Sequence, residues 1–282
     1  MSVQLKKKKV AILMYHSISD HATPKFKQFT VSPALFADHM AYLHQHAYTP
    51  ITVTQYVHAL SQGGDASSAL PERPVVLTFD DGFADFFTEA MPVLKQFNFT
   101  ATLYVATAFV NSTSLWLQRE KEMMRPMVTW EQLAEISALG IECGSHGHRH
   151  LQLDTLPSPV VQEEIVYSKL LLEQHVGGNV SSFAYPFGYY TAGARRQVQD
   201  AGYSSACAVK HAMSSETTDP FSLFRLLVKA DTSVNALAAL LNGHSSSVVT
   251  TIYLRTRTPV WQLARRASAS MRHYLPGGQP AQ

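Results

Sequence analysis

Cysteine is scarce in this sequence of 282 residues, with only Cys143 and Cys207 present. Two cysteines exclude a framework of several disulfides and leave at most one bridge. A reduced, buried pair is the simpler interpretation. Charge is scarce as well: charged residues make up 16% of the chain and the net charge is +2, so the composition does not indicate a nucleic-acid partner.

Long apolar runs are also missing. The basic stretch Lys6 to Lys9 is followed by a run of only five apolar residues, Val10 to Met14. A signal-peptide core needs roughly 7–15 such residues. No later stretch approaches the roughly 20 apolar residues that a helix needs to span a membrane. We therefore expect a cytoplasmic protein without a signal peptide.

The C-terminal region is rich in arginine, with Arg255, Arg257, Arg265, Arg266 and Arg272. We expect one domain over residues 1–245 and a basic tail over residues 246–282. A solvated tail is the simpler interpretation. Because the tail also contains Trp261, peripheral contact with an anionic membrane at its inner face is the alternative.

The sequence does contain a regular alternation of short apolar runs and helical patterns, which is typical of an α/β domain. The predicted strands are Val10–Met14, Val75–Phe79, Thr100–Ala106, Ile141–Cys143, Ser182–Tyr185, Ser204–Val209 and Phe224–Lys229. Residues 111–127 lack periodicity and indicate an insertion over one end of the fold. Six or more strand–helix units predict a distorted (β/α) barrel with about seven parallel strands, whose chemistry lies at the C-terminal strand ends.

Two adjacent carboxylates, Asp80 and Asp81, directly follow the predicted strand Val75–Phe79. In a cleft, like charges this close raise the pKa of one carboxyl group unless a cation lies beside them. One carboxylate on a metal ion and the other free to act as a base would resolve this conflict. Taken alone, Asp80-Asp81-Gly82 is also typical of a solvated turn, because Asp-Gly is a frequent turn pair.

His146 and His150 lie four residues apart, beyond the predicted strand Ile141–Cys143. In a helical turn this spacing places both imidazoles on one face, about 5–6 Å apart at Cβ, close enough to share one ion. A carboxylate as the third ligand leaves positions open for water and substrate. His148 would point elsewhere in such a turn. A histidine-rich surface loop is the alternative for any one of these residues.

Together, these motifs resemble the NodB-homology polysaccharide deacetylase family. The resemblance extends from about Val10 to Lys229 and includes Thr129-Trp130-Glu131-Gln132-Leu133 and Phe183-Ala184-Tyr185-Pro186-Phe187-Gly188. It implies a NodB-type barrel in which Asp80 is the general base and Asp81, His146 and His150 bind the metal. It also implies removal of N-acetyl groups from an amino sugar in a polysaccharide or glycan precursor.

The general acid is assigned through a second resemblance. The segment from Ile12 to Ile18, which contains Tyr15-His16, is similar to the Tyr-His segment of the bacterial exopolysaccharide deacetylase branch. In that branch the first strand delivers the acid, which implies that His16 protonates the leaving amine. A histidine that merely lines the barrel mouth is the alternative.

Two positions depart from the family pattern. Gly147 stands where the family often has Ser or Thr, whose hydroxyl can fix adjacent backbone. The motif around Pro186 lacks the Arg that usually precedes the Pro-aromatic pair and holds the catalytic Asp. Arg225, in the predicted strand Phe224–Lys229, is the expected substitute against Asp80, with a pairing to a surface acid as the alternative.

Two imidazoles and one carboxylate predict Zn²⁺ as the metal, with Co²⁺ or Ni²⁺ as alternatives. The predicted substrate-binding residues are Trp116, Tyr185, Pro186 and Phe187, because aromatic side chains near the mouth can stack on sugar rings, although several such aromatics are expected to belong to the core. Two other functions stay open: a metal-dependent amidase or esterase on a small non-carbohydrate substrate, and a non-catalytic carbohydrate-binding module.

Overall fold

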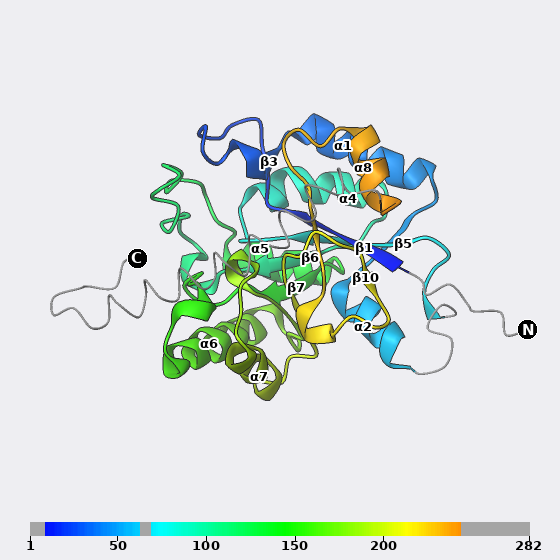
Figure 1. The fold of residues 1–282 in the computed structure, drawn as a ribbon. Coiled ribbons are helices and arrows are strands. Elements are labelled where there is room, and N and C mark those ends of the chain that lie inside the picture. Colours follow the sequence, from blue (N-terminus) through cyan, green and yellow to red (C-terminus); the bar gives the residue numbers. More distant parts are fainter. Residues whose placement is uncertain (1–8, 63–68, 244–282) are drawn as a thin grey trace, which may run out of the picture.

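The computed structural model describes residues 9–62 and 69–243 (Figure 1). The predicted basic tail over residues 246–282 lies outside the described residues, so the domain boundary near 245 and the membrane contact stay predictions. Among the described residues, no helix combines the length and the apolar character needed to cross a membrane. Both cysteines are buried and free, as expected.

The main sheet is built around the first strand, β1. Its strands follow the order β10-β1-β5-β6-β7-β8-β9, with β11 also pairing with β1 and β4 with β5. These strands are β1 (Lys9–Tyr15), β4 (Thr49–Ile51), β5 (Pro74–Phe79), β6 (Thr102–Val105), β7 (Glu142–Ser145), β8 (Ser182–Ala184), β9 (Ser205–Cys207), β10 (Ser214–Ser215) and β11 (Leu226–Leu227). All pairings are parallel except that of β1 with β10.

The two edges of this curled sheet approach each other through the segment that contains β11. Leu223 forms a parallel bridge with Cys207 of β9, and Leu226 pairs with Leu13 of β1. The predicted distorted barrel of about seven parallel strands is therefore confirmed. Because Arg225 lies between these two pairings, the closing segment delivers its side chain to the barrel.

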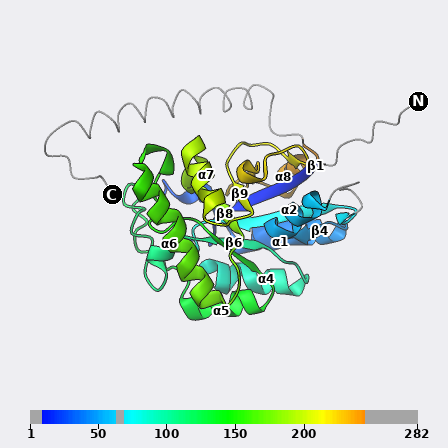
Figure 2. The same cartoon turned by 90° about the horizontal axis from the view of Figure 1, so that it is seen from below.

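The helices lie outside the sheet (Figures 1 and 2). They are α1 (Pro33–Gln45), α2 (Val53–Ser61), α4 (Met91–Gln96), α5 (Trp130–Ala138), α6 (Ser158–Val176), α7 (Ala192–Asp200) and α8 (Val234–Leu241). The predicted helix over residues 86–97 begins as a π-helix, η2 (Phe86–Ala90), and Pro92, which has no amide hydrogen, follows the junction with α4. At α5, the Thr129 side chain accepts a hydrogen bond from the amide of Gln132. The Gln132 side chain accepts one from the amide of Thr129, and the two bonds form a capping box.

Alternate residues of β1 belong to two hydrophobic clusters. Val10 and Ile12 pack in one cluster with Tyr56 of α2, whereas Leu13 and Tyr15 pack in the other, larger one. Helix α2 contacts both β5 and β9, which places it across the end of the barrel opposite the C-terminal strand ends.

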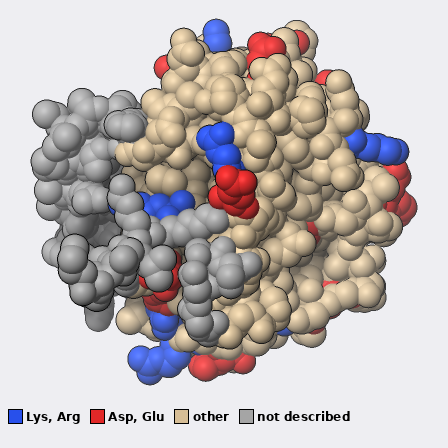
Figure 3. Space-filling model, turned by 90° about the vertical axis from the view of Figure 1, so that its right-hand side faces the viewer, with Lys and Arg blue, Asp and Glu red and all other residues tan. Residues whose placement is uncertain are grey.

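Several short elements were not predicted. These are β4, β10, and a separate two-stranded sheet of β2 (Ser17–Ile18) and β3 (Thr30–Val31). The predicted strand Phe224–Lys229 is reduced to the two residues of β11. Such elements have too few residues to show a period. On the face shown in Figure 3, the described acidic and basic side chains are few and interspersed, in keeping with a charged fraction of 16%.

Candidate active site and metal centre

The turn after β5 presents Asp80 and Asp81 at the end of the barrel. The amide of Asp80 donates to the carbonyl of Tyr15 on β1 at 3.0 Å, which extends the sheet by one step. Asp81 then adopts φ of 77° and Gly82 φ of 85°, both left-handed. A Cβ at Gly82 would lie 3.2 Å from Cγ1 of Val105, so this sharp turn favours glycine there. The turn separates the directions of the two carboxylates.

The histidine motif is a loop, and its predicted helical turn is wrong. Gly147 has φ of 78° and His150 has φ of 55°, and no residue from 146 to 150 is helical. The amide of His146 donates to the carbonyl of Val105, so the loop leaves directly from the edge of β7. The four-residue spacing still brings both rings together, with centroids 4.9 Å apart, because the left-handed residues turn the chain back.

Asp81, His146 and His150 form a buried cluster that could hold one metal ion, with a ligand atom of each within 4.8 Å of the others. Oδ1 of Asp81 lies 3.5 Å from Nε2 of His146 and 3.1 Å from Nε2 of His150. Nδ1 of His146 is 2.7 Å from the carbonyl oxygen of Ala184, a hydrogen bond that directs Nε2 toward Asp81. These donors fit a divalent cation with nitrogen and oxygen ligands.

The electrostatics of the cluster suit metal binding. Burial lowers the pKa of His146 to about 4, so its imidazole is neutral at neutral pH and Nε2 keeps its lone pair. Burial by itself would raise the pKa of Asp81, but the charge and hydrogen bond of His150 outweigh it, and the pKa falls below its usual range. The shifts favour an ionised carboxylate at Asp81 and a neutral imidazole at His146.

Asp80 lies beside the cluster and pairs with Arg225. Nη1 of Arg225 donates to Oδ1 of Asp80 at 2.5 Å and Nη2 donates to Oδ2 at 2.8 Å, with Arg225 fully buried. Burial alone would raise the pKa of Asp80, but Arg225 holds it below its usual range. Oδ2 of Asp80 is 3.8 Å from Nε2 of His146. The expected pairing of Arg225 with Asp80 is therefore present, in place of the alternative pairing with a surface acid, while the catalytic roles of both residues stay predictions.

His16 is half-buried and directly follows β1, whose last residue, Tyr15, pairs with Phe79, the residue before Asp80. Its ring lies 5.1 Å from that of Phe29, and its buried Nδ1 has no hydrogen-bond partner among the described residues. Beyond the larger effects of burial and closer partners, a charge on His16 also lowers the pKa of Asp80 and of Asp81. The imidazole is therefore within electrostatic reach of both carboxylates.

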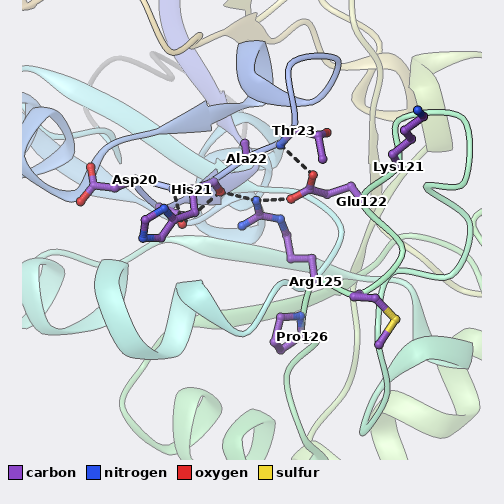
Figure 4. A pocket seen from close by; sticks show the side chains of 10 residues that line it. Asp20, His21, Ala22, Thr23, Lys121, Glu122, Arg125 and Pro126 are labelled. Carbon is purple, nitrogen blue, oxygen red and sulfur yellow. Dashed lines mark hydrogen bonds and ion pairs between the residues drawn. The ribbon is translucent and has the colours of Figure 1, made fainter.

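The chain after His16 is tied to the insertion over residues 111–127. Ser17 donates to Oδ2 of Asp85 at 2.6 Å, and Nη1 of Arg125 donates to the same oxygen at 3.2 Å. Arg125 also donates to Glu122 at 2.6 Å. Figure 4 shows this guanidinium in the wall of a pocket of about 650 Å³. The pocket is lined by Ser19–Thr23 and by residues 121, 122 and 124–126, none of which belongs to the metal cluster.

The four predicted substrate-binding residues fall into two groups. Tyr185 and Pro186 are buried, and the Tyr185 hydroxyl donates to the carbonyl of Phe221, so a direct contact of these two side chains with a sugar stays a prediction. Phe187 is 46% exposed, and its ring centroid lies 4.7 Å from that of His150. Trp116 is partly exposed, and its ring centroid lies 6.1 Å from that of Phe83, 4.5 Å from that of Phe109 and 5.1 Å from that of His150.

Sequence reasoning missed one buried acid that contacts the histidine loop. Glu164 on α6 is fully buried and accepts hydrogen bonds from the amides of His148 and Arg149. A signal was available, because Val161, Glu164, Ser168 and Leu172 recur at helical spacing on one face of α6. A carboxylate in such a stripe needs a partner.

Comparisons with known proteins agree with this geometry. The family model described as polysaccharide deacetylase matches residues 67–206. A Bacillus subtilis protein, YxkH, a polysaccharide deacetylase by name, is 28% identical over 235 residues, or 83% of this chain and 77% of that protein. The poly-beta-1,6-N-acetyl-D-glucosamine N-deacetylase of Escherichia coli is 27% identical over 48% of this chain, but the match spans only 20% of that enzyme.

Solved structures show the same fold. The deacetylase PplD of Streptococcus pyogenes, solved in complex with acetate, superposes with a TM-score of 0.71 at 25% identity and covers 84% of this chain and 99% of its own.

Proposed function

We propose that the chain, whose residues 67–206 match the polysaccharide deacetylase family model, removes N-acetyl groups from an amino sugar of a polysaccharide or glycan precursor, using a bound divalent metal. The observation that carries this proposal is the buried Asp81–His146–His150 cluster with the Arg225-paired carboxylate of Asp80 beside it. The acetate in the Streptococcus pyogenes structure is the product that such a reaction would release.

The residues present fit a metal, and we assign Zn²⁺ to Asp81, His146 and His150. Two imidazoles and one carboxylate are a ligand set that zinc accepts at catalytic sites, and Co²⁺ or Ni²⁺ would fit the same donors. When bound, such an ion lowers the pKa of a coordinated water toward about 7 and polarises a carbonyl oxygen. The remaining chemistry is assigned to side chains of the protein itself.

Asp80 is proposed as the general base that takes a proton from the attacking water. Its carboxylate is ionised, because Arg225 opposes the effect of burial on its pKa, and the two hydrogen bonds from Arg225 fix its orientation. Each carboxylate oxygen keeps a second lone pair for the water. Arg225 therefore acts as a positioning residue.

His16 is proposed as the general acid. The water oxygen bonds to the acetamide carbon, the C–N bond breaks, and the leaving nitrogen takes a proton from the His16 imidazole. The products are acetate and a free amino group. In support, His16 and Asp80 directly follow Tyr15 and Phe79, which pair across the sheet, and His16 has a buried Nδ1 without a hydrogen-bond partner among the described residues.

The exposed ring of Phe187 is proposed to contact the sugar. It lies against His150 at the mouth, so a ring stacked on Phe187 would bring its substituents toward the metal cluster. The buried Tyr185 stacks on Tyr190, with ring centroids 4.5 Å apart.

Acetate release is the direct test. The purified protein would be offered N-acetylglucosamine oligomers, lipid-linked amino sugars and small cyclic amides, with and without a chelator. We expect acetate only from N-acetylated glycans and only in samples without chelator. Turnover confined to small amides would instead indicate an amidase. Metal binding without turnover of any substrate would indicate a carbohydrate-binding protein.

A further inference from the structure

Glu164 is a carboxylate outside the metal cluster that holds the backbone of the histidine loop. Oε2 accepts a hydrogen bond from the amide of His148 at 3.1 Å and from the amide of Arg149 at 2.7 Å. Oε1 accepts from Nε of Arg149 at 2.6 Å. Since the side chain of Glu164 is fully buried, these contacts compensate its charge in place of water.

The rest of the loop backbone is held from the opposite side. The amides of Thr107 and Ala108, which follow β6, donate to the carbonyls of Gly147 and His148 at 3.3 and 2.8 Å. The amide of Gly147 donates to Oγ of Ser145 at 3.2 Å. Glu164 thus completes the set by binding the amides of the next two residues.

The two histidines of the cluster depend on this backbone to different degrees. The ring of His146 is fixed by the hydrogen bond between its Nδ1 and the carbonyl of Ala184. Nδ1 of His150 is buried and has no hydrogen-bond partner among the described residues. Apart from the contact of its Nε2 with Asp81, the His150 ring is held by contacts with Trp116 and Phe187 and by its own backbone, whose φ of 55° is unfavourable for a residue other than glycine.

We infer that Glu164 is a positioning residue for the metal site: by binding the amides of His148 and Arg149, it holds the left-handed loop that brings His150 to Asp81. This inference rests on the proposed metal site. It concerns metal affinity and not the chemical step, because Glu164 contacts the loop backbone and Arg149 and none of the three ligands.

The test is a comparison of two neighbouring substitutions. Glu164→Gln keeps the size of the side chain but removes its charge and one acceptor. Glu163→Gln is the matched control, because Glu163 is 57% exposed and its carboxylate pairs with the Arg149 guanidinium at 3.1 Å. Zinc affinity would be measured by competition with a chromophoric chelator, together with the melting temperature of each metal-free protein.

We expect Glu164→Gln to weaken zinc binding roughly 10- to 100-fold, the usual effect of losing a residue that orients metal ligands, and Glu163→Gln to leave it unchanged. A purely structural role would lower the melting temperature and spare the zinc affinity. Unchanged affinity in a folded Glu164→Gln variant, or equal losses in both variants, would overturn the inference.

A measurement on the unmodified protein covers a failure of Glu164→Gln to fold. In the metal-free chain, the amides of His148 and Arg149 should be protected from hydrogen exchange, because both are bonded to a buried carboxylate. Exchange as fast as that of an exposed loop would overturn the inference. Since neither readout uses acetate release, weaker zinc binding in a protein without deacetylase activity would refute the proposed function and leave the role of Glu164 standing.

Discussion

Arg225 and Asp80 are 145 residues apart in the chain, yet the guanidinium of one meets the carboxylate of the other through two hydrogen bonds, at 2.5 and 2.8 Å. The closing segment of the barrel delivers the arginine and β5 delivers the aspartate, so the pair forms only when the barrel is complete. Nε of Arg225 also donates to the carbonyl of Ala208 at 3.3 Å, which restrains the guanidinium further.

Replacing Arg225 with lysine should slow the reaction and change its pH dependence. Lysine keeps the charge but cannot donate two parallel hydrogen bonds, and we expect kcat to fall about 10- to 100-fold with zinc content unchanged. Arg225 lowers the pKa of Asp80, so a weaker partner should raise it. Because Asp80 must be ionised to act, the acid limb of the rate profile should move to higher pH.

The control for this variant is Arg195→Lys. Arg195 also makes two hydrogen bonds to one carboxylate, that of Asp219, both at 2.7 Å, but it is 31% exposed and lies on α7. The Arg195→Lys variant should leave kcat and the acid limb of the pH–rate profile unchanged. An Arg225→Lys profile that coincides with that of the unmodified protein would show that Arg225 does not orient or tune Asp80.

Replacing His16 with glutamine should cost acetamide hydrolysis about 10²- to 10⁴-fold, the range typical of a general acid. The loss should be much smaller for an aryl acetate ester, because an aryloxide leaves without being protonated. Initial rates on both substrates measure the difference. His21→Gln, an exposed histidine five residues along the same segment, is the control. Equal losses on amide and ester would remove the acid assignment.

Replacing Phe187 with alanine should raise the KM for a glycan oligomer by about tenfold and change kcat little, because the exposed ring would contribute binding and not chemistry.

Replacing Tyr185 with phenylalanine should affect stability and not binding. The lost hydrogen bond to Phe221 should lower the free energy of unfolding by about 1 kcal/mol, and KM should stay unchanged. A raised KM for Tyr185→Phe would contradict a purely structural role of the buried Tyr185 side chain.

The sequence predicted those elements of the fold in which apolar residues follow a regular spacing over many positions. The fully buried strand β5 and the helix α6 were found because their apolar residues run over six and nineteen positions. The two-residue strands β10 and β11 carry no period, and the closure of the barrel depends on pairings between Leu223 and β9 and between Leu226 and β1 that only the folded chain reveals.

Within the site, residue types were more predictable than conformations. Asp81, His146 and His150 were grouped correctly from their positions after strands, but the loop was expected to be helical, and its left-handed φ values at Gly147 and His150 were not foreseen. The burial of Tyr185 was missed because an aromatic residue at a strand end looks the same in sequence whether its ring faces the core or the mouth.

The central claim is that Asp81, His146 and His150 hold the metal while Asp80 serves as the base, and one paired measurement tests it most directly. Bound zinc per chain and acetate release from an N-acetylglucosamine oligomer would be determined on the unmodified protein, on Asp80→Asn and on His146→Ala. We predict bound zinc with at least about 10³-fold less acetate for Asp80→Asn, and loss of both for His146→Ala. Normal acetate release by Asp80→Asn, or undiminished zinc in His146→Ala, would contradict the claim.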